Sequence, residues 1–115
     1  MLRLARTGAL IARAPRAAVA PWARAVGVLV APFLSYDALL LPRCRSVHTW
    51  FLREALDLAF VDGDGVVRRT VERAGPWKFF FGPREACAVI ELPAGTLCGI
   101  GVAVGDRIEG LPPLE

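Results

Sequence analysis

Short apolar runs separated by glycine, proline and aspartate make up most of the chain, and this pattern predicts β-strands. The clearest pair is Leu56 to Val61 and Val66 to Val71, two runs of β-type composition. They are joined by Asp62-Gly63-Asp64-Gly65, which supplies the positive-φ residues that a tight turn needs. The pattern predicts a hairpin here.

A second hairpin is predicted at the start of the chain, where Leu2 to Arg6 and Ala9 to Arg13 flank Thr7-Gly8. A helix is the competing interpretation, because it would gather a basic stripe on one face: Arg3, Arg6, Leu10, Arg13 and Arg16. Gly8 and Pro15 interrupt that helix at a cost of roughly 1–3 kcal/mol each, so the hairpin is favoured.

Further strands are predicted over residues 38–41, 46–52 and 86–92, followed by a turn into a final strand over 104–108. Helical segments are limited to Pro21 to Val26 and a short turn from Thr96 to Ile100. With at least six short strands and one or two short helices, the sequence predicts a mainly β fold, a small barrel or sandwich. Its 115 residues, 55% of them hydrophobic, fit a single domain that needs no disulfide or metal to hold its core.

Positive charge is concentrated in residues 1–36, which carry five arginines and no acid. Nucleic-acid binding through these side chains is a weak hypothesis, since arginine bias also follows genome composition. It would rest on Arg3, Arg6, Arg13, Arg16 and Arg24.

No stretch of the sequence is long enough for a membrane span, because the longest uncharged candidate, residues 25–36, has 12 residues and contains Pro32. The opening Met1 to Arg6 resembles a secretory n-region, but Arg13 interrupts the apolar run that should follow. We therefore expect a cytoplasmic protein, with export or envelope association as the alternative.

The three cysteines, Cys44, Cys87 and Cys98, are odd in number and lack a C-x-x-C spacing. This predicts reduced thiols and neither a disulfide framework nor a zinc site. The Asp62 turn begins like a calcium-binding loop but has Val66 and Arg73 where ligands should follow. We predict no metal and no cofactor.

Five ordered blocks of sequence together resemble a known family. They are Cys44 to Thr49, Leu56 to Asp62, Pro76 to Lys78, Ala88 to Gly95 and Val104 to Ile108. The chain resembles the domain-of-unknown-function 192 family over residues 22–109, which leaves residues 1–20 as a basic hairpin or arm and 110–115 as a tail. The resemblance implies a mainly β domain of bacterial and archaeal type with no assigned role. Leu52 and Ala55 replace the Met and Pro usual in the family, which puts any ligand held by that segment in doubt.

Arg53 and Asp57 form the strongest polar pair, because residues four apart on an extended segment share a face. Glu91 of another strand could join them there. A structural ion pair is the favoured interpretation over ligand binding. Trp77 could stack on a sugar or base, although packing over a barrel end is the commoner role of such a residue.

Two functional hypotheses follow. The preferred one is a non-catalytic ligand-binding or protein-interaction module that uses His48, Arg53, Asp57, Trp77 and Glu91. The run Phe79, Phe80 and Phe81 adds a candidate partner surface, since three consecutive rings cannot all point inward from one strand. The alternative is a small hydrolase-like enzyme with His48 as base and Cys44 or Thr49 as nucleophile. The ligand, the partner and the oligomeric state are left open.

Overall fold

The computed structural model describes residues 1–17, 37–49 and 54–114, and ten strands and one helix lie within these ranges. The strands are β1 (Leu2–Leu4), β2 (Leu10–Ala12), β3 (Pro15–Ala17), β4 (Ala38–Pro42), β5 (Ser46–His48), β6 (Leu56–Val61), β7 (Val67–Ala74), β8 (Phe79–Phe81), β9 (Ala88–Pro93) and β10 (Ile108–Glu109). The helix is α2 (Thr96–Ile100).

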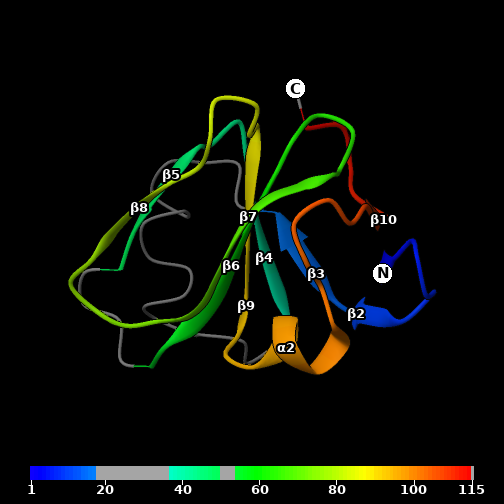
Figure 1. Ribbon diagram of the computed structural model, residues 1–115, viewed down its shortest axis with the longest axis horizontal. Helices are drawn as coiled ribbons and strands as arrows, with labels where there is room; N and C mark the ends of the chain where they lie inside the picture. The colour runs from blue at the N-terminus through cyan, green and yellow to red at the C-terminus, as the bar shows by residue number, and fades with distance from the viewer. Residues whose placement is uncertain (18–36, 50–53, 115) are drawn as a thin grey trace.

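A five-stranded sheet in the order β3-β4-β9-β6-β7 forms the centre of the molecule. All its pairs are antiparallel except β3 with β4. A two-stranded ribbon, β5-β8, lies on one side of it, and a three-stranded sheet, β10-β1-β2, lies on the other (Figure 1). The sheets do not close into a barrel, so the predicted mainly β fold is confirmed in its sandwich-like form.

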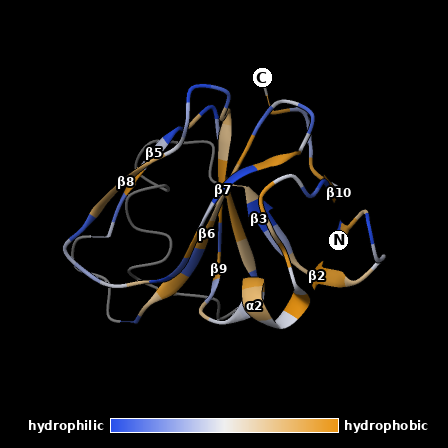
Figure 2. Cartoon of the chain, in the orientation of Figure 1, coloured by the Kyte–Doolittle hydropathy of each residue, from blue (hydrophilic) through white to orange (hydrophobic). Residues whose placement is uncertain are grey.

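The central strands are buried on both faces, because each face packs against a separate apolar cluster. The α2-side cluster includes Leu2, Leu4, Leu40, Ala59, Val61, Val67, Ile90, Leu92, Leu97 and Ile108. The ribbon-side cluster consists of Leu39, Leu41, Val47, Leu56, Leu58, Phe60, Ala74, Ala86 and Val89. Successive residues of β4, β6 and β9 alternate between the two clusters, as the period of a strand requires. Figure 2 shows hydrophobic residues along β2 and α2 and hydrophilic residues in the turns at the rim.

Most of the predicted elements are present. Both predicted hairpins form, as β1 with β2 and as β6 with β7. The predicted strands at 38–41 and 86–92 correspond to β4 and β9, and the helical turn to α2. The helix predicted from Pro21 to Val26 lies outside the described residues, and so does the end of the strand predicted over 46–52. The parallel strand β3 was not predicted.

The three cysteines are free thiols, as the sequence indicates. In the part of the chain that the structure describes, no helix is long and apolar enough to cross a membrane.

Candidate functional site

Asp57 is completely buried and binds backbone amides of two neighbouring segments. Its Oδ1 accepts a hydrogen bond from the N–H of Arg73 at 2.9 Å, and its Oδ2 accepts from the N–H groups of Gly95 at 3.1 Å and Leu97 at 2.9 Å. The register shift between β6 and β7 falls opposite Asp57, where Arg73 has a φ of 52°. The Asp57 side chain therefore holds an irregular part of β7 and the start of α2 in place. Both of its oxygens accept backbone hydrogen bonds within the fold.

Glu91 is 6% exposed and has an apolar environment in the sheet. It lies opposite Leu39 of β4 and Leu58 of β6, on the face that carries the ribbon-side cluster. None of the described residues forms a hydrogen bond with its carboxyl group. Burial alone raises the pKa of Glu91 to about 7, because an apolar environment penalises the charged form.

The structure does not bring Asp57 and Glu91 together. Asp57 lies opposite Leu92 in the β6-β9 register, and directly opposite residues share a face of a sheet. Glu91 is the next residue along β9, so it points to the other face. The grouping of these two carboxylates expected from the sequence is therefore corrected by the register. Arg53 lies outside the described residues.

Thr49 fixes the turn that leads into β8. Its side chain is fully buried, and its hydroxyl donates to the carbonyl of Gly75 at 2.6 Å and accepts from the N–H of Lys78 at 3.0 Å. The carbonyl of Thr49 also accepts from the N–H of Trp77, which has a φ of 63°. The turn holds Trp77 at the surface with 62% of the residue exposed.

The ribbon β5-β8 has one buried face and one exposed face. Val47 is paired with Phe80, and both pack toward the ribbon-side cluster. His48 is paired with Phe79, and Ser46 with Phe81. Phe79 and Phe81 are 50% and 63% exposed. Strand alternation thus divides the three phenylalanines, with Phe80 inward and the other two outward.

The outward rings lie close to one another. The ring centroids of Phe79 and Phe81 are 4.7 Å apart, and those of His48 and Phe79 are 6.4 Å apart. With Trp77 at the start of the ribbon, these side chains form an exposed surface that we call the aromatic face: His48, Trp77, Phe79 and Phe81.

Cys44 and His48 lie in different surroundings. The Cys44 thiol is half-buried, packs against the ribbon-side cluster and donates to the carbonyl of Ser46 at 3.0 Å. The His48 ring lies on the exposed side of the ribbon. The Thr49 hydroxyl, the other nucleophile suggested by the sequence, is occupied by backbone groups of Gly75 and Lys78.

The Asp62 turn is held by its own chain. Asp62 Oδ1 accepts from the N–H groups of Asp64 and Val66, and Oδ2 accepts from Arg68. Burial alone would raise the pKa of Asp62, but the N–H of Val66, the Arg68 guanidinium and the N–H of Asp64 together lower it. No described group of three His, Cys, Asp or Glu side chains gathers as a metal site would require.

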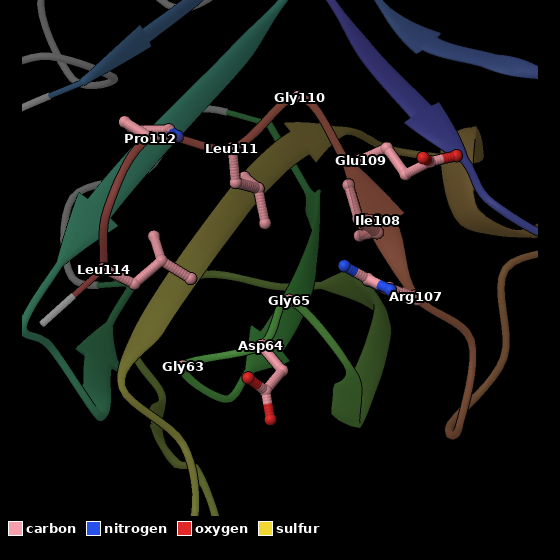
Figure 3. Close-up of a pocket in the computed structure, with 10 residues that line it drawn as sticks. All are labelled: Gly63, Asp64, Gly65, Arg107, Ile108, Glu109, Gly110, Leu111, Pro112 and Leu114. Carbon is pink, nitrogen blue, oxygen red and sulfur yellow. The ribbon is translucent and has the colours of Figure 1, made fainter.

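A cleft of about 240 Å³ lies between this turn and the segment that follows β10. Figure 3 shows the Asp64 carboxylate pointing away from that segment, with the Arg107 side chain near Gly65. The polar groups of the cleft do not converge on one point, so the aromatic face is the better candidate for binding.

Sequence reasoning missed that two basic segments pair with each other in the β5-β8 ribbon. Residues 43–49 and 75–84 contain no acid and four cations, Arg43, Arg45, Lys78 and Arg84. Arg69 of β7 donates to the carbonyl of Phe81, and its guanidinium lies 5.9 Å from the ring centroids of Phe60 and Phe80, on the inward side of the ribbon. The absence of acids in both segments is visible in the sequence, but only the β5-β8 pairing shows that they are neighbours.

The fold and this face define a small β domain with an exposed aromatic ribbon, and the comparisons place it in a family. The model of domain of unknown function 192, described as an uncharacterized ACR, matches residues 6–110. The chain belongs to this family, and the match begins earlier than the resemblance found by inspection.

Relatives named UPF0127 occur in archaea. A protein of Pyrococcus furiosus is 42% identical over 65 residues, which cover 56% of this chain and 54% of that protein. A protein of Thermococcus sibiricus is 28% identical over 88 residues, or 72% of this chain and 56% of that protein. The chain therefore spans about half the length of the curated relatives it matches.

Two solved bacterial structures have similar folds. A protein of unknown function from Novosphingobium aromaticivorans superposes with a TM-score of 0.71 at 21% identity, covering 84% of this chain and 74% of the other. A candidate transcription regulator from Sinorhizobium meliloti superposes with a TM-score of 0.70 at 31% identity, covering 84% and 80%. The chain is thus a small β domain of an uncharacterised family.

Proposed function

We propose that this chain is a non-catalytic binding module whose binding surface is the aromatic face. One observation carries the proposal: Phe79 and Phe81 are each at least half exposed with ring centroids 4.7 Å apart on the β5-β8 ribbon, and Trp77, just before β8, is 62% exposed. Exposed aromatic rings that gather in one patch are uncommon on monomeric proteins and mark binding surfaces.

The fate of the other candidate residues supports this choice. The Asp57 carboxylate and the Thr49 hydroxyl serve buried backbone groups, and the Cys44 thiol donates to Ser46. Among the described residues of the predicted site set, we assign His48 and Trp77 to the aromatic face, and Arg53 lies outside the described residues. The hydrolase-like alternative would need Cys44 or Thr49 activated beside His48, an arrangement that the described residues do not form.

Titration of ¹⁵N-labelled protein, followed by NMR, tests the proposal. The probes are citrate, a nucleoside triphosphate, an acidic peptide containing one tryptophan, and a thymidine oligonucleotide. We expect at least one probe to shift the amide signals of β5 and β8 saturably, and Phe79→Ala to abolish that shift.

Val104→Ala provides the matched control, because Val104 is 60% exposed but lies outside the ribbon. It should leave the titration unchanged. The proposal fails if no probe moves the ribbon signals at about 1 mM, the weak limit of specific binding, or if a probe is chemically converted by the protein.

A further inference from the structure

Two of the three cysteines meet where β4 ends and β9 begins. β4 pairs with β9 as far as Pro42 opposite Ala88, and a regular continuation would place Arg43 opposite Cys87. Instead, the N–H of Cys44 donates to the carbonyl of Cys87 at 3.0 Å. Arg43 has a φ of 52°, the left-handed conformation that the extra residue of one class of β-bulge adopts. The bulge therefore brings Cys44 opposite Cys87.

This arrangement meets the first requirement of a disulfide bond. Directly opposite residues of antiparallel strands have Cα atoms about 4.5–5.5 Å apart, and a disulfide spans Cα atoms about 4.4–6.8 Å apart. Cys98, the third cysteine, lies in α2, beyond the other end of β9 (Figure 1). The length of β9, roughly 20 Å, separates it from Cys87. Only Cys44 and Cys87 are therefore placed to bond with each other.

Both thiols can be reached from outside. Cys44 and Cys87 are half-buried, and both line one cleft of about 290 Å³. The cleft is also lined by Arg43, Arg45, Ala86 and Leu114. A small molecule in this cleft would meet either sulfur.

The fold does not hold either thiol strongly. Cys44 Sγ donates to the carbonyl of Ser46 at 3.0 Å, and Cys87 Sγ donates to the carbonyl of Glu85 at 3.7 Å. A thiol is a weak hydrogen-bond donor, so each sulfur can leave its acceptor by rotation about the Cα–Cβ bond. Disulfide formation therefore needs side-chain rotation and no rearrangement of the two strands.

We propose that Cys44 and Cys87 are a redox-modification site, which forms an intramolecular disulfide by exchange with a low-molecular-weight disulfide. One protein thiolate attacks a sulfur of the small disulfide, releases one small thiol and forms a mixed disulfide. The second protein thiolate attacks the protein sulfur of that mixed disulfide and releases the second small thiol. The two cysteines lose two electrons and two protons, which the two small thiols carry away.

The bond would connect the ribbon to the central sheet. Cys44 lies two residues before β5, and Cys87 directly precedes β9. In a reducing environment the pair stays as free thiols, and oxidising conditions close it. The site is independent of the aromatic face, so it stands or falls separately from the proposed function.

Oxidation of the folded protein with oxidised glutathione tests the proposal. The remaining thiols are then alkylated, and the disulfides are located by peptide mapping under non-reducing conditions. We expect a bond between Cys44 and Cys87, with Cys98 outside it, and its reversal by dithiothreitol. The melting midpoint should rise on the order of 10 °C, because the bond closes a long loop of the unfolded chain.

The unfolded chain provides the reference for pairing by chance. In urea, the shorter loop between Cys87 and Cys98 should close roughly eightfold more readily than the longer loop between Cys44 and Cys87. The preferred pair should therefore change when the protein unfolds. Cys98→Ser, at an exposed position, is the matched control and should retain the bond and the melting shift, whereas Cys87→Ser should lose both.

Three results would overturn the proposal. One is a folded protein that acquires only separate glutathione adducts on its cysteines. Another is pairing of Cys87 with Cys98 in the folded protein as readily as in urea, which would show that the fold does not direct the reaction. The third is a bond between Cys44 and Cys87 that lowers the melting midpoint, because the two strands would then have to distort to form it.

Discussion

Glu91 shows how one buried side chain can make stability depend on pH. Its carboxyl group lies among apolar neighbours, and burial raises its pKa from 4.5 to about 7. Between these two values the folded protein holds a proton that the unfolded chain releases. The free energy of unfolding therefore falls as pH rises through this window, by about 3 kcal/mol in total from this group.

Glu91→Gln should remove that dependence, because glutamine has nearly the same shape and does not titrate. We expect the variant to be up to about 3 kcal/mol more stable than the wild type at about pH 8, and similar to it near pH 4.5. Urea unfolding of both proteins across this range measures the difference, in which the contributions of all other carboxyl groups cancel. Parallel stability curves would show that Glu91 is charged in the folded protein at neutral pH.

Asp57 differs from Glu91 because its carboxyl oxygens accept hydrogen bonds from the fold. Asp57→Ala would leave the N–H groups of Arg73, Gly95 and Leu97 without their acceptor. Each buried donor left unpaired costs about 1–3 kcal/mol, so we expect a loss of at least about 3 kcal/mol in urea unfolding. Asp64→Ala, in an exposed turn, should change stability by less than about 0.5 kcal/mol. Equal effects of the two substitutions would contradict this role.

At the scale of the element, the β5-β8 ribbon depends on Thr49. Thr49→Val keeps the shape but removes the hydroxyl that binds Gly75 and Lys78. We expect a loss of about 2 kcal/mol and faster hydrogen exchange at the Lys78 amide, which loses its acceptor. Thr49→Ser retains the hydroxyl and should keep the protection of that amide. Unchanged exchange in all three proteins would show that the turn is held by other contacts.

The elements that could be predicted from the sequence are those with local signals. The Asp-Gly turn after Val61 and the Gly8 turn specify hairpins through a few adjacent residues, and both hairpins form. The parallel strand β3 has no such signal: its pairing with β4 joins Pro15 to Ala38 across 22 residues. A pairing of this kind is decided by tertiary packing.

The candidate site was less predictable because it depends on register. A shift of one residue turns a side chain to the other face of a sheet. Residue spacing suggested that Asp57 and Glu91 could meet, but the pairing of Asp57 with Leu92 separates them. The three-phenylalanine run was informative for the same physical reason, since alternation requires some of its rings to face outward.

At the scale of the whole molecule, the two described ends of the chain meet in one sheet. β1 pairs with β2 on one side and with β10 on the other. Arg6 also reaches Asp106, with Nε 2.9 Å from Oδ1. That pair is largely exposed on the arginine side, so its contribution to stability is small. The junction therefore relies on close backbone packing between β1 and β10.

Gly110 is the position where this packing leaves no room. It has a φ of 95°, and a Cβ placed there would overlap the carbonyl oxygen of Met1. Gly110→Ala should cost at least about 3 kcal/mol, because it combines backbone strain with a clash against main chain that cannot rotate away.

Gly105→Ala is the matched control: its φ is 97°, but a Cβ there would meet nothing within 4 Å. It should cost only the strain, about 1–2 kcal/mol. Chemical denaturation of both variants measures the difference, and hydrogen exchange should locate the added loss of Gly110→Ala at β1 and β10. Equal costs would mean that β1 can move away from β10 freely, and that the meeting of the two ends contributes little to the stability of the fold.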